Sequence, residues 1–154
     1  DAYKQEIAEE LIRLGNAVPA EVDMGYHLCY GSPADAHLAM PKDMGIMVEM
    51  VKSFLPGLQR EMNFLHLPVP QDRSDAAYFA PLKNLDLPSA TELYLGLIHH
   101  GDASGDKARI AAACTVVDTF GISTECGWGR AEPAKVPGLI SAHRQVMEQQ
   151  AQRA

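Results

Sequence analysis

The fold is decided by residues 92–129, which read ELYLGLIHHGDASGDKARIAAACTVVDTFGISTECGWG. This stretch opens with an apolar run typical of a buried strand, continues with a helical pattern from Asp106 to about Phe120, and closes with a second short run that ends in glycines. No hairpin signal such as Asn-Gly joins the two apolar runs. We therefore predict two parallel strands, at 92–101 and 121–129, connected by a helix that Asp106 caps.

The rest of the chain repeats this alternation. Helical spacing of apolar residues predicts three further helices, at 2–14, 41–62 and 131–154. Pro56 should break the second of them near Leu55. Short apolar runs predict two further strands, at 22–30 and 63–70, with a long loop over 71–91.

Four parallel strands with helices define an α/β fold class and make up half of an eight-unit TIM (β/α)8 barrel. A doubly wound sheet is the main competitor on pattern alone, although no GxGxxG motif follows the first predicted strand. We expect the half barrel.

Composition limits the possible partners and compartments. The chain has 154 residues, of which 47% are hydrophobic, which suits a single domain over 1–154. Its net charge of −7 argues against nucleic-acid or membrane partners, and no apolar run reaches the length of about eighteen residues that spans a bilayer. Three cysteines without a disulfide framework favour the cytoplasm. Because the sequence opens at Asp1 inside a helical pattern, we expect it to be a fragment of a longer chain.

Residues that can bind metal or move protons gather at the predicted strand ends. Functional groups of parallel α/β folds lie at the carboxyl ends of the strands. The residues there, or within the strands, are His27 and Cys29 of the first strand, His66 of the second, His99 and His100 of the third, and Glu125 and Cys126 of the fourth.

His27 and Cys29 are two residues apart on a strand, so that both side chains point to one face and can bind one metal ion. Cys126 can approach from another strand end. Two thiolates and one imidazole suit Zn²⁺, and three protein ligands leave a fourth position for water or substrate, as in catalytic sites. The alternative is that these residues are a small buried thiol and a hydrogen-bonded strand histidine. Cys114 lies in an apolar helix and is expected to pack in the core.

Two stretches carry a resemblance to a known family, GYHLCYGS at 25–32 and FGISTECGWGRAEPAKVPGLISAHR at 120–144. Here the chain resembles the C-terminal zinc domain of cobalamin-independent methionine synthase, within the superfamily that includes uroporphyrinogen decarboxylase. The resemblance implies the C-terminal half of a barrel and zinc bound by His27, Cys29 and Cys126. It also implies a histidine that helps to protonate the leaving amine, for which His99 is the closest match.

The sequence departs from that family at one ligand. Where the family has a zinc-binding glutamate, this sequence has Pro68. Either Glu125 or His66 substitutes for that glutamate, or three ligands act with water or substrate, or the site is degenerate. Tyr30 and Trp128, each beside a ligand, could shape a substrate pocket, with ordinary packing as the alternative. Arg130 could pair with an anionic group of the substrate or with solvent.

The resemblance implies a methyltransferase of methionine biosynthesis, which moves a methyl group from a folate-type donor to a thiol such as homocysteine. Two alternatives stay open. One is another alkyl-thiol transferase or demethylase of the same superfamily, and the other is a non-catalytic metal-binding relative. A half barrel has two open sheet edges, so we expect a homo-oligomer or association with the missing half of the barrel.

Overall fold

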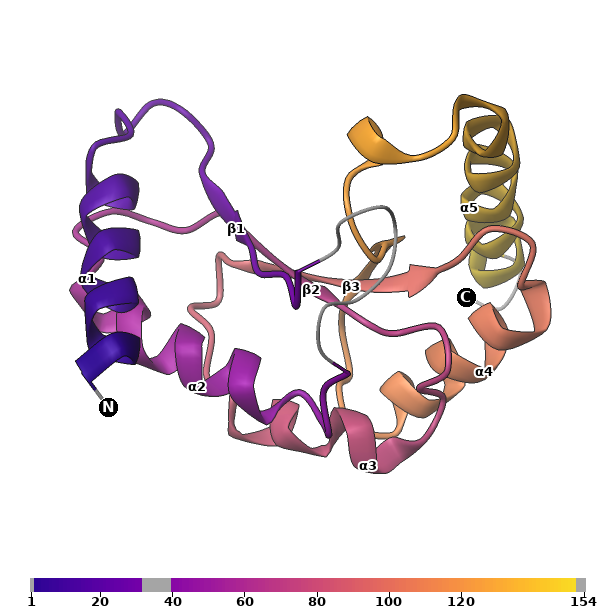
Figure 1. Cartoon of the computed structure of the whole chain (residues 1–154), viewed down its shortest axis with the longest axis horizontal. Helices are drawn as coiled ribbons and strands as arrows, with labels where there is room; N and C mark the ends of the chain where they lie inside the picture. Colours follow the sequence, from indigo (N-terminus) through magenta and orange to yellow (C-terminus); the bar gives the residue numbers. More distant parts are fainter. Residues whose placement is uncertain (1, 32–39, 152–154) are drawn as a thin grey trace.

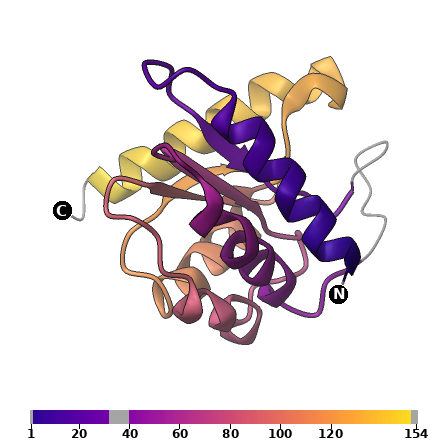
Figure 2. The same cartoon turned by 90° about the vertical axis from the view of Figure 1, so that its left-hand side faces the viewer.

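The computed structural model describes residues 2–31 and 40–151, except for the side chains of Arg130, Gln150 and Ala151. Its strands form one parallel sheet in the order β1-β2-β3-β4, with helices packed around it (Figures 1 and 2). The strands are β1 (Gly25–His27), β2 (Phe64–Pro68), β3 (Glu92–Ile98) and β4 (Gly121–Thr124). The predicted α/β class with four parallel strands is therefore confirmed.

Helical elements connect and follow the strands. The α-helices are α1 (Ala2–Asn16), α2 (Gly45–Phe54), α3 (Ala76–Phe79), α4 (Ala103–Cys114) and α5 (Val136–Ala151). Short 3₁₀ helices are η2 (Leu55–Gly57), η3 (Ala80–Asn84), η4 (Trp128–Arg130) and η5 (Pro133–Lys135). Within the described ranges, none of the helices has the length and apolar character that crossing a bilayer requires.

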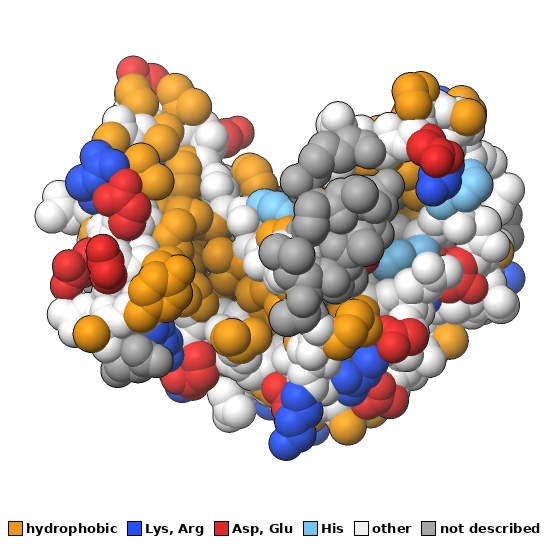
Figure 3. Space-filling model, in the orientation of Figure 1, with side chains coloured by type: hydrophobic (Ala, Val, Ile, Leu, Met, Phe, Trp, Pro, Cys, Tyr) orange, Lys and Arg blue, Asp and Glu red, His pale blue; other side chains and the backbone are white. Residues whose placement is uncertain are grey.

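Side chains alternate along the strands between a buried face and a more exposed face of the sheet. Leu65 and Leu67 of β2 and Leu95 of β3 are fully buried and belong to the main core, to which α2 contributes Val51 and Phe54. The intervening strand residues, such as Phe64 and His66, point to the opposite and more exposed face. Hydrophobic side chains also fill the space between α1 and β1 (Figure 3).

The strand order separates the two fold hypotheses. In a doubly wound sheet the order reverses at a switch point. The four described strands instead follow one another in sequence order, with parallel pairing throughout. This arrangement is compatible with half of a barrel.

The first strand is shorter than the predicted 22–30. The Arg60 guanidinium donates to the carbonyl oxygens of Val18, Pro19 and Val22, which holds this segment in turns rather than in the sheet. The predicted helix at 41–62 is also shorter: α2 ends at Phe54, and Pro56 lies in η2. The predicted break near Leu55 is confirmed.

The long loop at 71–91 proves to be partly helical. It contains α3 and η3, and Asp75 caps α3 by accepting a hydrogen bond from the backbone N–H of Tyr78 at 2.9 Å. An Asp N-cap is a local signal that the sequence did contain. The side chains of Tyr78 and Phe79 are fully buried, which anchors the segment to the core.

The prediction that Asp106 caps the helix between β3 and β4, which is α4, was wrong. Asp102 caps α4 by accepting from the N–H of Gly105, whereas Asp106 lies inside the helix and is 2% exposed. Asp106 instead pairs with Arg109 and accepts the backbone N–H of His99 at 3.0 Å. The buried Arg109 also donates to the carbonyl of Leu97, so this ion pair fixes the carboxyl end of β3.

Candidate metal centre

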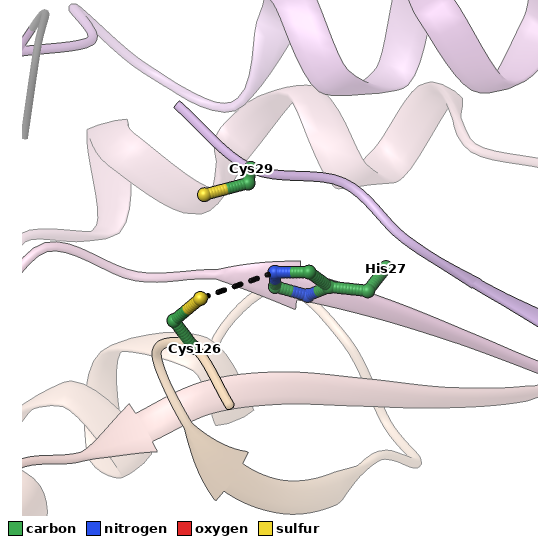
Figure 4. A group of neighbouring side chains, drawn as sticks. All are labelled: His27, Cys29 and Cys126. Carbon is green, nitrogen blue, oxygen red and sulfur yellow. Dashed lines mark hydrogen bonds between the residues drawn. The ribbon is translucent and has the colours of Figure 1, made fainter. Parts of the chain in front are cut away.

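Three side chains that could hold a metal ion meet at the carboxyl ends of β1 and β4. One donor atom from each of His27, Cys29 and Cys126 lies within 4.8 Å of the others. His27 ends β1, Cys29 comes from the segment that follows it, and Cys126 comes from the turn after β4 (Figure 4). The Sγ of Cys126 lies 3.6 Å from Nε2 of His27. Residues 99 positions apart in the sequence thus form one cluster.

Backbone and tyrosine hydrogen bonds hold the segment that carries Cys29. The N–H of Leu28 donates to the carbonyl of His66 at 3.2 Å, which keeps the chain beside β2 after β1 ends. Farther on, the hydroxyls of Tyr30 and Tyr78 lie 3.1 Å apart, and Tyr78 donates to the carbonyl of Pro68. Because the single hydroxyl hydrogen of Tyr78 is used in that bond, Tyr30 is the donor to Tyr78.

The position of Cys126 depends on a close approach between β3 and the turn after β4. A Cβ atom at Gly96 would lie 2.6 Å from the Cα atom of Glu125, so only glycine fits here without a shift of backbone. After the strand ends, the hydroxyl of Thr124 donates to the carbonyl of Cys126 at 2.8 Å. Trp128 Nε1 donates to the same hydroxyl at 2.9 Å. These contacts fix the turn that carries the thiol.

Two surface hollows meet at Cys126. The smaller one, of about 240 Å³, is bordered by His99, Cys126 and Trp128 among others. The larger one, of about 470 Å³, is bordered by Cys126, Trp128, His27 and His143 among others. His27 and Cys29 are exposed and Cys126 is half-buried. Histidine side chains reach the surface near the middle and toward the right of the face shown in Figure 3. The donor cluster is therefore open to ions and small molecules.

A second histidine lies directly behind His27. His66 of β2 pairs with His27 in the sheet register, their rings stack with centroids 4.6 Å apart, and their Nδ1 atoms are 2.8 Å apart. Nε2 of His66 lies 3.0 Å from the carbonyl oxygen of Thr124. Burial, followed by the charge of His27, lowers the pKa of His66 to about 4, and partial burial also lowers the pKa of His27. Both rings are therefore neutral at pH 7, the form in which a histidine binds metal.

His99, the predicted acid or base, lies near the cluster and borders the same hollow as Cys126. Its Nε2 lies 2.9 Å from the carbonyl of Val69, and its backbone N–H donates to Asp106. Since a carbonyl can only accept, Nε2 of His99 carries a ring hydrogen. The ring is thus held in a defined orientation beside the cluster.

The predicted substrate-binding residues have different surroundings. Tyr30 is half-buried and donates to Tyr78, so part of its role is to hold the Cys29 segment. Trp128 borders both hollows and also braces Thr124. Arg130 ends η4, and its side chain lies outside the part of the chain that the structure describes.

A fourth protein ligand is not among the donors that the structure gathers in its described residues. His66 does not substitute for the family glutamate in this arrangement, because both of its ring nitrogens face other groups. Glu125 is half-buried, and its charge contributes to the raised pKa of Tyr30, for which burial is the main cause. Pro68 is buried in β2 and offers only its carbonyl, which already accepts from Tyr78.

One prediction about cysteine was wrong, and the supporting contacts of two residues were not predicted. Cys114 is exposed at the end of α4 rather than packed in the core, because the buried face of that helix carries Ile110 and Ala113. The sequence predicted that His66 lies in a strand, but it did not predict the contact of His66 with His27. Nor did it assign any role to Thr124, which touches both sides of the site. The contact between the histidines depends on sheet register, which no local pattern shows.

No family model matches the sequence, and no curated protein or solved structure matches it.

Proposed function

We propose that this chain binds one zinc ion through Nε2 of His27 and the Sγ atoms of Cys29 and Cys126. The observation that carries the proposal is the gathering of these three donors within 4.8 Å. Ligand atoms of a tetrahedral zinc ion lie about 3.3–3.8 Å from one another, so a contraction of about 1 Å completes the set. Two soft thiolates with one imidazole fit zinc, and the three ligands leave a coordination position for a substrate.

We further propose that the centre serves transfer of a methyl group to a thiol. When bound, zinc acts as a Lewis acid that keeps a substrate thiol deprotonated at neutral pH. The sulfur lone pair then forms the new S–CH3 bond, while the bond between the methyl carbon and the donor nitrogen breaks and leaves its electron pair on nitrogen. His99 borders the same hollow as Cys126 and, as an imidazolium, could deliver the proton that this nitrogen takes up. A folate-type donor and homocysteine are the substrates that the family resemblance suggests.

The two hollows that share Cys126 support a reaction between two small molecules rather than metal storage alone. Thr124, Cys126, Gly127 and Trp128 border both of them. A thiol and a methyl donor could thus approach the same centre from different sides.

A second candidate is transfer from a donor other than methyl-folate. It is favoured by Pro68, which stands where the resemblance places a zinc-binding glutamate and offers no side-chain donor. Turnover of a panel of methylated donors with a thiol acceptor would separate the two reactions. A metal-binding protein without catalysis would bind zinc and turn over no donor in the panel.

We also propose that the sheet is the C-terminal half of a TIM barrel. In the described residues, β1 pairs only with β2 and β4 only with β3, so each has an edge that could join further strands. Either the rest of such a barrel or a second copy of the chain could supply them. Light scattering of the purified chain tests the second possibility, and a monomer at micromolar concentration would count against it.

Elemental analysis combined with thiol titration tests the metal proposal. We expect about one zinc ion per chain, which Cys126→Ser removes. Cys114→Ser is the matched control, because Cys114 is exposed and lies outside the cluster. In the zinc-loaded protein, Cys114 should react with a thiol reagent while Cys29 and Cys126 are protected. A wild-type protein that takes up no zinc, or a Cys126→Ser variant that keeps its zinc, would refute the assignment.

A further inference from the structure

We propose that His66 is a positioning residue of the metal centre: it accepts the Nδ1 hydrogen of His27 and so presents the Nε2 lone pair of His27 to the metal. This inference rests on the zinc site proposed above and adds to it a residue that is not itself a ligand.

The ring hydrogen of His66 lies on Nε2. The carbonyl oxygen of Thr124 can only accept, and it lies 3.0 Å from Nε2 of His66, so this nitrogen carries a hydrogen. A neutral imidazole carries one ring hydrogen. The Nδ1 atom of His66 therefore carries a lone pair and acts as an acceptor.

The ring hydrogen of His27 lies on Nδ1. The two Nδ1 atoms lie 2.8 Å apart, which is a hydrogen-bond distance, and one of them must donate. Since Nδ1 of His66 accepts, Nδ1 of His27 donates. The single hydrogen of His27 is then used, and its Nε2 keeps a lone pair. This is the nitrogen that lies 3.6 Å from Sγ of Cys126.

The fold fixes the positions of the two histidine rings. The sheet register places His27 directly beside His66, and the rings stack at 30° with centroids 4.6 Å apart. At the far end, the hydroxyl of Thr124 donates to the carbonyl of Cys126. Thr124 therefore links the partner of one ligand to the backbone of another. Outer partners of metal-bound histidines commonly raise metal affinity by about 10–100-fold through such orientation.

Two substitutions of His66 separate this role from a structural one. His66→Asn keeps an acceptor, because Oδ1 of asparagine is as many bonds from Cα as Nδ1 of histidine. His66→Phe keeps a flat ring that can stack but has no acceptor. His143→Phe is the matched control, because His143 borders the same hollow while its Nδ1 bonds to the Leu139 carbonyl of its own helix.

The first readout is the zinc dissociation constant, measured by competition with a chromophoric chelator at neutral pH. We expect His66→Phe to weaken binding by about 10–100-fold, and His66→Asn and His143→Phe to stay within about threefold of wild type. Zinc binding by the Phe variant as tight as by wild type would overturn the inference, as would an Asn variant as weak as the Phe variant. Wild-type protein that binds no zinc would instead refute the proposed metal site.

The second readout is the tautomer of His27, which does not depend on zinc. Nitrogen-15 NMR of histidine-labelled, metal-free protein distinguishes a ring with hydrogen on Nδ1 from one with hydrogen on Nε2. We expect the Nδ1–H form of His27 in wild type and His66→Asn, and a mixture of both forms in His66→Phe. An Nε2–H form of His27 in the wild-type protein would overturn the inference even if zinc binds.

Discussion

The buried Arg109 offers the sharpest test of how the edge of the sheet beside the donor cluster is held. Its side chain is completely buried and donates to the carbonyls of Leu97 and Gln71 and to the carboxylates of Asp102 and Asp106. These bonds join α4 to the segments that follow β2 and to the end of β3. We predict that Arg109→Met is among the most destabilising single substitutions in the chain.

The expected loss of folding free energy follows from the groups that lose their partner when methionine replaces Arg109. Asp106 is 2% exposed and would remain as a buried carboxylate without its cation, although it keeps the N–H of His99. Breaking a buried ion pair by removing one partner costs about 3–5 kcal/mol of folding free energy. Arg109→Lys should recover only part of this, because an ammonium has three donors on one atom and cannot span acceptors that the guanidinium fork reaches.

Urea unfolding followed by circular dichroism measures the effect as a shift of the midpoint at constant slope. Lys107→Met is the matched control, because Lys107 is an exposed cation of the same helix and its loss should cost less than about 0.5 kcal/mol. An Arg109→Met variant within about 1 kcal/mol of wild type would show that this reasoning about the buried pair is wrong.

Three further predictions follow from other contacts. Gly96→Ala should lower the free energy of unfolding by about 1–3 kcal/mol and weaken zinc binding, since its Cβ would lie 2.6 Å from the backbone of Glu125. Gly127→Ala is the control, because the space around its Cβ is open, and it should leave the urea midpoint and the zinc affinity unchanged. Equal behaviour of the two variants would contradict this reasoning. Asp75→Ala should cost about 1 kcal/mol at pH 7 through loss of the α3 cap. The hydrogen bond from Arg73 lowers the pKa of Asp75 below its ordinary 3.8. The stabilisation by Asp75 is therefore present above pH 3.8 and is lost as the pH falls through the lowered value. The urea midpoints of wild type and variant should converge in acid and stay apart at neutral pH. Removing bound zinc with a chelator should make Cys29 and Cys126 as reactive as the exposed Cys114 toward a thiol reagent, and thiols equally reactive before and after chelation would count against metal binding.

The fold class and the residues of the candidate metal site could be predicted because both leave local marks in the sequence. Apolar runs that end in glycine or proline, alternating with helical spacing, predicted four parallel strands with helices, and the structure contains them. The same pattern placed His27, Cys29 and Cys126 at strand ends, where parallel sheets collect functional groups. The strand limits were less accurate, since side chains such as Arg60 bind the flanking backbone and withdraw it from the sheet.

Other features could not be predicted because they depend on contacts between distant residues. Asp102 and Asp106 are both suitable helix caps, and only the burial of Arg109 makes Asp106 its partner. Cys114 lies in an apolar stretch, and only the packing of α4 shows which side of that helix faces solvent.

The sequence by itself determined the alternation of strands and helices and supplied the side chains of the candidate metal site. The tertiary structure alone decided that the donors of His27, Cys29 and Cys126 come within 4.8 Å, and that His66 stands behind His27. The physical reason is that strand periodicity is a property of neighbouring residues, whereas register and close approach are set by packing across the sheet. The register of β1 on β2 and the missing Cβ of Gly96 bring these side chains together, and both act between segments that local sequence patterns do not connect.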